Sequence, residues 1–184
     1  MKSVMISIKP KWCELIANGK KTVEVRKTKP KIDTPFKVYI YEPRAQCDRP
    51  IMLDFGELDF HGRGQVIGEF VCDSIFMIWD GYAGNLGDDC LTFEERENYL
   101  KGNNGYGWHI SDIVIYDKPK ELSEFYKPCT DIYQYCQGCK NGLVQYPSDV
   151  ETYEDISGCY FDTVCLNRIT KPPQSWCYCE ELEE

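Results

Sequence analysis

Charged residues gather in the segment GKKTVEVR, which spans residues 19–26. Its β-branched residues favour a strand, and a period of two would put Glu24 and Arg26 on one face. A carboxylate and a guanidinium two residues apart can hold each other in fixed rotamers. The arginine fork then keeps donors for a planar polar ligand. These residues therefore favour a binding site, and the alternative is an exposed ion pair that contributes little.

The elements around this segment can be predicted from local patterns. Pro10 suits a first helical position, residues 10–18 carry an apolar stripe at helical spacing, and Gly19 is a suitable C-cap. Thr92 and Glu95 form a capping box that predicts a second helix ending at residues 102–103. Strands are predicted at residues 36–41, 65–72 and 106–116, with a short helix within 118–126. These elements describe a small β-rich fold with helices at its margins.

The pattern G-x-K-x-x-E-x-R, formed by Gly19, Lys21, Glu24 and Arg26, resembles the signature of the ASCH domain family. Residues 6–10 and 106–110 also resemble strands of that family. The resemblance covers residues 3–125 and resumes near residues 173–176. It implies a mixed, β-rich fold: a small PUA-like β-barrel, closed or nearly closed, with flanking short helices. We expect a single domain over 1–184, in which 127–170 is a cysteine-rich C-terminal insertion and 171–184 returns to the barrel.

Members of the ASCH family are expected to bind RNA or nucleosides in a cleft beside the motif. The resemblance thus implies an RNA- or nucleotide-binding protein that recognises a base or nucleoside-like ligand in a charged cleft. An aromatic ring would stack on the base while polar groups address its edge. Trp108 could instead belong to the core and His109 could be structural. The residues expected to bind the ligand are Lys9, Lys21, Glu24, Arg26, Trp108, His109, Ser175 and Trp176.

The resemblance also raises an enzymatic alternative. Some small bacterial ASCH proteins are amidohydrolases that remove the acetyl group from acetylated cytidine, using a lysine and a threonine from this segment. Lys21 matches the lysine, but Glu24 stands at the threonine position. Thr22 is displaced by two residues, about 6–7 Å along a strand, which is too far for near-attack geometry. Lys21 and Glu24 remain the catalytic candidates, with Glu24 as a general base for water, and we favour binding over catalysis.

Charge is distributed unevenly along the 184 residues. Residues 1–50 carry 12 basic and 5 acidic side chains, a net of +7, whereas the remainder carries 9 and 25, a net of −16. This balance argues for a local nucleic-acid contact rather than a broad one. The basic residues of this part that could meet phosphates are Lys20, Lys21, Arg26, Lys27, Lys29 and Lys31. Alternatively, residues 26–31 form a solvated turn. No membrane-spanning run or secretory signal is visible, so we predict a cytoplasmic protein without membrane contact.

Seven of the eleven cysteines lie between residues 129 and 179. An odd number of cysteines cannot all pair within the chain, and a reducing compartment favours thiols or metal ligands. A structural zinc ion and free thiols are both compatible with these spacings. The insertion could also recognise a protein partner through its many tyrosines, or those rings could form a satellite core. The predicted zinc ligands are Cys136, Cys139, Cys159 and Cys165.

Overall fold

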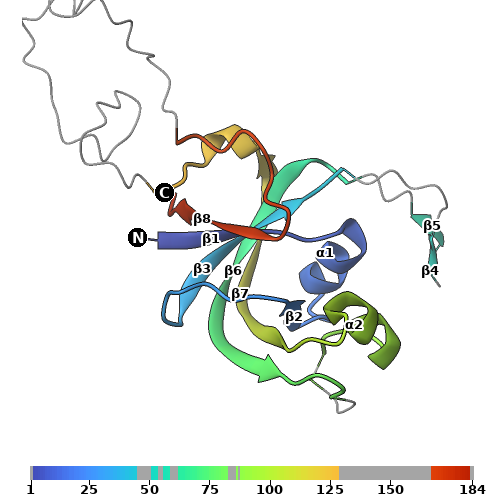
Figure 1. The fold of residues 1–184 in the computed structure, drawn as a ribbon. Coiled ribbons are helices and arrows are strands. Elements are labelled where there is room, and N and C mark those ends of the chain that lie inside the picture. Colours follow the sequence, from blue (N-terminus) through green and yellow to red (C-terminus); the bar gives the residue numbers. More distant parts are fainter. Residues whose placement is uncertain are drawn as a thin grey trace, which may run out of the picture.

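The computed structural model describes residues 2–44, 51–53, 56–58, 62–82, 86, 88–128 and 167–182. A six-stranded mixed sheet carries the fold, in the order β2-β7-β6-β3-β1-β8 (Figure 1). Only the β1–β3 ladder is parallel among its five pairings. The strands of this sheet are β1 (Lys2–Ser7), β2 (Val23–Arg26), β3 (Phe36–Glu42), β6 (Gln65–Ile78), β7 (Gly105–Lys120) and β8 (Trp176–Glu180). A separate ladder joins β4 (Ile51–Leu53) to β5 (Gly56–Leu58).

The two α-helices are those that the sequence predicts. Helix α1 (Pro10–Ala17) begins at the proline, and Gly19 follows it with a φ of +67°, a conformation that glycine adopts without a steric cost. Helix α2 (Phe93–Leu100) begins with the predicted capping box between Thr92 and Glu95. Its C-cap is Lys101, whose backbone has the left-handed conformation, so the helix ends one residue before the predicted Gly102. The predicted short helix is the 3₁₀ helix η1 (Leu122–Glu124).

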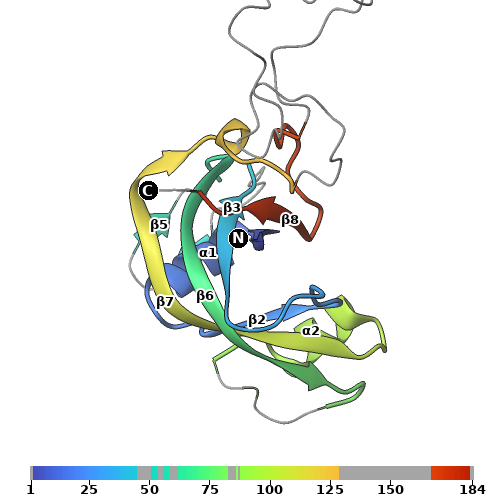
Figure 2. The ribbon, with the colours of Figure 1, turned by 90° about the vertical axis from the view of Figure 1, so that its left-hand side faces the viewer.

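The expected closed barrel is wrong, because the sheet is curled but open. Strands β6 and β7 are 14 and 16 residues long and bend the sheet around its concave face (Figure 2). Three register shifts interrupt their ladder, and such irregularities increase local bending. In the described part of the chain, no backbone ladder joins the outer strands β2 and β8. The Arg26 side chain links β2 to the other end of the sheet instead: its Nη2 donates to the Ser7 carbonyl of β1 at 2.7 Å, and its Nη1 donates to the carbonyl of Ser175, directly before β8, at 3.5 Å.

The sheet separates two hydrophobic cores because successive side chains point to opposite faces. Val4 and Ile6 of β1 enter the concave core, while Met5 enters the core on the other face. Strand β8 pairs antiparallel with β1, so the end of the chain lies beside its beginning (Figure 1). None of the helices within the described residues is long and apolar enough to span a membrane.

Candidate functional site

The motif residues Lys21, Glu24 and Arg26 form one buried ionic cluster. Glu24 lies between two cations: its Oε1 is 2.9 Å from Arg26 Nη2, and its Oε2 is 3.4 Å from Lys21 Nζ. The three residues are only 2%, 7% and 6% exposed, in the order Lys21, Glu24, Arg26. The alternative of an exposed strand-surface ion pair is therefore wrong. Buried charges of this kind must satisfy one another, because removal from water is costly.

Lys21 is held by acceptors on several sides. Its Nζ donates to the Val23 carbonyl at 2.9 Å and to the Asp89 carbonyl, and it also faces Glu24. The Trp12 ring of α1 lies with its centroid 5.2 Å from the same nitrogen. An ammonium group has three donors, and three oxygen acceptors surround this one. Lys21 is thus fixed as a structural cation at the base of the site.

The segment that precedes α2 supplies a second buried ion pair, which sequence reasoning missed. Asp89 Oδ2 accepts from Arg96 Nη1 at 3.0 Å, and both residues are about 5% exposed or less. In the same segment, the Asp88 carbonyl accepts a hydrogen bond from the backbone N–H of Thr22 at 2.9 Å. The capping box at Thr92 predicted the helix, but no local pattern signals that its arginine faces an aspartate seven residues earlier.

The strand registers place the motif on the concave face in two rows. Glu24, Trp108 and Ile75 are direct cross-strand neighbours and share one row. Arg26, Tyr106 and Met77 form the next row, nearer the rim. Exposure rises toward the rim at the end of β6: Met77 is 43% exposed, and Trp79, directly after the strand, is 62% exposed. The concave face therefore runs from a dry floor to an open edge.

Trp108 belongs to the floor and is fully covered. Its ring centroid lies 5.9 Å from that of Phe36 and 6.0 Å from that of Trp176. The core interpretation of Trp108 fits this position, and stacking on a base does not. Trp108 Nε1 and Arg26 Nε are buried donors with no acceptor among the described residues. Both nitrogens are covered by protein, so they do not face the pocket.

The remaining predicted site residues divide into two groups. Ser175 and Trp176 join the cluster: Arg26 Nη1 lies 3.4 Å from Ser175 Oγ, and Trp176 Nε1 donates to Thr28 Oγ1 at 3.0 Å. His109 does not join the cluster. It follows Trp108 directly in β7, so its side chain lies on the opposite face of the sheet, where its Nδ1 is 2.7 Å from Asp73 Oδ1. Lys9 is the exposed N-cap residue of α1, and its side chain makes no contact with the cluster among the described residues.

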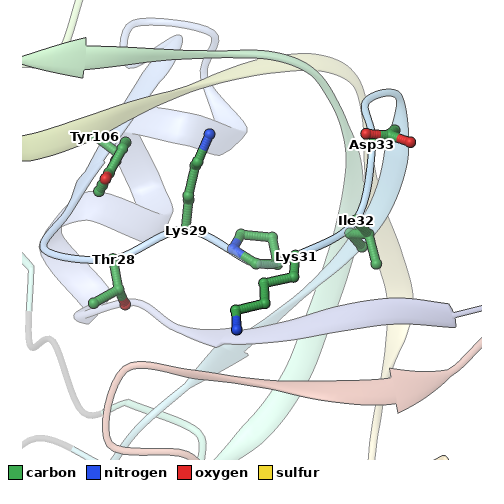
Figure 3. Close-up of a pocket in the computed structure, with 7 residues that line it drawn as sticks. Thr28, Lys29, Lys31, Ile32, Asp33 and Tyr106 are labelled. Carbon is green, nitrogen blue, oxygen red and sulfur yellow. The ribbon is translucent and has the colours of Figure 1, made fainter.

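A pocket of about 440 Å³ lies beyond the end of β2 (Figure 3). Its charged side chains are Lys29, Lys31 and Asp33, and Tyr106 forms an aromatic wall. Lys29 Nζ lies 5.7 Å from the Tyr106 ring centroid, and Lys27 Nζ lies 5.2 Å from that of Tyr99. The pocket is lined by Thr28, Lys29, Pro30, Lys31, Ile32, Asp33 and Tyr106.

The loop that forms this pocket is anchored to β8. The Lys31 backbone N–H donates to the Tyr178 hydroxyl at 2.7 Å, and Thr28 accepts from Trp176. Within the part of the chain that the structure describes, the ammonium groups of Lys27, Lys29 and Lys31 contact no carboxylate. The backbone of the loop is thus fixed, while its lysine charges remain available to an anion.

Two ionisable side chains near the cluster, Cys13 and Tyr99, stay neutral. Burial raises the pKa of Cys13 well above its usual value, and the negative charges of Glu42 and Glu24 raise it further. Burial also raises the pKa of Tyr99, although the positive charge of Arg26 opposes this. A thiol that stays protonated is a poor nucleophile. Cys13 is therefore unsuited to covalent catalysis.

The predicted zinc ligands Cys136, Cys139, Cys159 and Cys165 lie outside the described residues. Among the residues that are described, no three histidine, cysteine, aspartate or glutamate side chains are grouped so that they could hold a metal ion. The zinc site therefore stays a prediction.

The sequence model of the ASCH domain matches residues 6–181, which is nearly the whole chain. The chain belongs to the ASCH domain family. The match runs across the basic loop and includes β8, so the buried cluster and the pocket both lie within the family domain. A search of curated proteins finds no match to this ASCH domain.

Solved structures of an ASCH protein from Zymomonas mobilis resemble this ASCH domain. A serine-to-alanine variant of that protein is 17% identical with a TM-score of 0.53, covering 97% of this chain and 89% of the other. The unsubstituted protein is 22% identical with a TM-score of 0.47, covering 65% and 73% of the two chains. At this identity the first comparison supports the fold alone.

Proposed function

We propose that this ASCH domain binds RNA or a nucleotide-like ligand at the pocket beside Tyr106. The observation that carries the proposal is that Lys27 and Lys29 lie over the rings of Tyr99 and Tyr106, while no carboxylate among the described residues contacts the lysines of this loop. Lysines that track phosphates, alternating with rings that stack on bases, are the usual elements of a surface for single-stranded nucleic acids. A volume of about 440 Å³ also lies within the range of small-ligand pockets.

The buried cluster supports this site from below. Arg26 is the backbone partner of Tyr106, and its guanidinium anchors β2, beside the aromatic wall, to the Ser7 carbonyl. Ser175 and Trp176 connect the same arginine and the following Thr28 to the far edge of the sheet. We assign Lys21, Glu24 and Arg26 the role of positioning the pocket, and the lysines of the loop the role of binding phosphate.

Hydrolysis of an acylated nucleoside is the weaker candidate. A general base needs a carboxylate with a lone pair directed at water, but both oxygens of Glu24 face cations. Lys21 would have to give up a donor that a carbonyl or a carboxylate already accepts. The contacts of both residues favour a structural role over acid–base chemistry.

Fluorescence anisotropy with a labelled eight-nucleotide single-stranded RNA tests the proposal. We expect the triple variant Lys27→Ala, Lys29→Ala and Lys31→Ala to bind at least tenfold more weakly at low salt. Loss of three phosphate contacts should also lower the slope of log K against log salt by about 2. A matched variant removes three exposed lysines elsewhere: Lys2→Ala, Lys118→Ala and Lys127→Ala.

The matched variant separates a local site from general charge attraction. If both triple variants lose affinity equally, the loop is not the binding site. If the wild-type protein binds neither this RNA nor a nucleoside monophosphate, the proposed function is wrong. Mass spectrometry of acetylated cytidine incubated with the protein tests hydrolysis directly, and a deacetylated product that disappears in Glu24→Gln would support the weaker candidate.

A further inference from the structure

We infer that Trp79 is a second base-stacking platform and that the ligand is a single strand of several nucleotides. This inference rests on the proposed function of the pocket. Trp79 is 62% exposed, the highest value among the exposed large hydrophobic residues of the described chain. A single exposed aromatic ring is common on protein surfaces. The position of Trp79 relative to the pocket is what suggests a function for it.

Trp79 directly follows the strand that lies beside the pocket wall. Met77 is the direct cross-strand partner of Tyr106, so their side chains share the concave face. Trp79 is the first residue after β6 and lies two residues beyond Met77, so the alternation of extended chain directs it toward the same side of the sheet. Two residues of extended chain cover about 7 Å, so Trp79 lies roughly one nucleotide step beyond Met77.

The backbone at Trp79 is held in place while the ring remains exposed. The Trp79 carbonyl accepts from the Tyr82 N–H at 3.1 Å, closing a turn. The next N–H, that of Asp80, donates to Asn104 Oδ1 at 2.9 Å and ties the turn to the residue before β7. A ring on a fixed backbone loses little entropy when a base stacks on it.

The charge around these rings selects a nucleic acid as the occupant. Lys29 lies over Tyr106 at one end of the path, and Lys27 lies over Tyr99 of α2. Asp80 is the acid closest in sequence to Trp79, and its Oδ1 lies on the side of Gly102. Along a path from Tyr106 across Met77 to Trp79, bases could therefore stack on the two rings and contact the Met77 thioether. The lysines at the start of this path would bind phosphates.

The test compares ligand length with the presence of the ring. Uridine monophosphate and oligouridines of two, four and eight nucleotides are titrated against wild type, Trp79→Ala and Trp79→Phe. We expect Trp79→Ala to weaken binding of the tetramer and octamer by roughly 5- to 100-fold and to leave the monophosphate unchanged. Trp79→Phe should restore most of the loss, because a phenyl ring still stacks. Phe93→Ala, which removes an exposed aromatic residue of α2, is the matched control.

The outcomes separate this inference from the proposed function. If oligouridine binding depends on the lysines of the loop but is unchanged in Trp79→Ala, only the inference is wrong. If wild type binds none of these ligands, both are wrong. Sedimentation velocity of wild type and Trp79→Ala adds a third outcome: a ring that changes self-association but not RNA affinity belongs to a protein interface, and that result also overturns the inference.

Discussion

Residues 21–26 and residues 27–31 are adjacent in the chain and both carry basic side chains, but they occupy opposite environments. The first segment places Lys21 and Arg26 in a buried cluster with Glu24. The second leaves Lys27, Lys29 and Lys31 exposed on a loop. The comparison teaches that charges of a signature motif can be buried in ion pairs, while less distinctive charges next to them stay exposed.

The physical basis of this difference is desolvation. A buried ion pair contributes little net stability, but loss of one partner is costly because the other charge stays buried. An exposed lysine gives up little when it is removed, yet it can exchange counterions for a phosphate. Stability and affinity should therefore respond to opposite sets of substitutions, and the predictions below test this separation.

The largest expected effect is on stability in Arg26→Ala. The sequence alone suggested that this variant and Glu24→Ala would weaken binding without unfolding the domain. The structure predicts instead a loss of about 3–5 kcal/mol in the free energy of unfolding, because Glu24 would remain buried beside a vanished partner. Urea unfolding measures it, with Lys29→Ala as the exposed control, expected within about 0.5 kcal/mol of wild type. A loss below about 1 kcal/mol in Arg26→Ala would contradict the buried cluster.

A comparable loss is expected when the floor of the concave face is emptied. Trp108→Ala should lower the free energy of unfolding by about 3–5 kcal/mol, since the ring is fully buried. Trp176→Ala should cost less, because that ring is only partly buried at the edge of the same core. Thermal or urea unfolding of both variants tests the order. Equal losses of unfolding free energy in Trp108→Ala and Trp176→Ala would contradict the distinction between a buried floor and a partly exposed rim.

An intermediate effect is expected at the start of α2, which carries Arg96 and Tyr99. Thr92→Ala removes the side-chain acceptor of the capping box and should cost about 1 kcal/mol in unfolding free energy. Thr92→Ser keeps the hydroxyl and should lie near wild type. Hydrogen exchange of the α2 amides provides a local readout, and unchanged protection in the alanine variant would exclude a role for this cap.

The smallest expected effect belongs to His109, which lies on the opposite face from the pocket. Burial works to raise the pKa of Asp73, but the hydrogen bond and charge of His109 outweigh it and hold that pKa below its usual value. The Asp73 carboxylate contributes to the free energy of unfolding at pH values above its pKa in the unfolded chain, about 4. This contribution is lost as the pH falls through the lower pKa that Asp73 has in the folded protein.

His109→Gln should therefore reduce stability by less than about 1 kcal/mol at neutral pH, and the difference from wild type should shrink under acid conditions. RNA affinity should not change. If His109→Gln keeps its stability but loses RNA affinity, His109 belongs to the binding site, as the sequence suggested.

The local elements of this fold could be predicted because their signals are local. The proline at the start of α1, the capping box of Thr92 and the alternation along β7 each act over a few residues. The pairing of Glu24 with Arg26 was also predictable from a period of two. Burial was not, because it depends on contacts between distant parts of the chain, such as that of Arg26 with Ser175, which is 149 residues away and directly before β8 (Trp176–Glu180).

The parts of the site that escaped prediction have the same cause. The Asp89 carbonyl reaches Lys21, and Arg96 holds the Asp89 carboxylate, only after α2 has docked; no spacing signals these contacts. Trp108 and Trp176 were both predicted to bind the ligand, but only the folded structure shows that Trp108 is fully buried in the floor and Trp176 partly buried at the rim. The open sheet likewise follows from strand order, which a family resemblance to a barrel did not reveal.

We propose that the loop lysines and the Tyr106 wall form the binding surface, while the motif cluster lies beneath it. Ultraviolet crosslinking of a 4-thiouridine oligonucleotide to the wild-type protein, mapped by mass spectrometry, tests this claim most directly. We predict crosslinks within residues 27–33 and at Tyr106 and Trp79, all removed by excess unlabelled RNA. Competable crosslinks confined to the opposite face, around His109 and Asp73, would contradict the account.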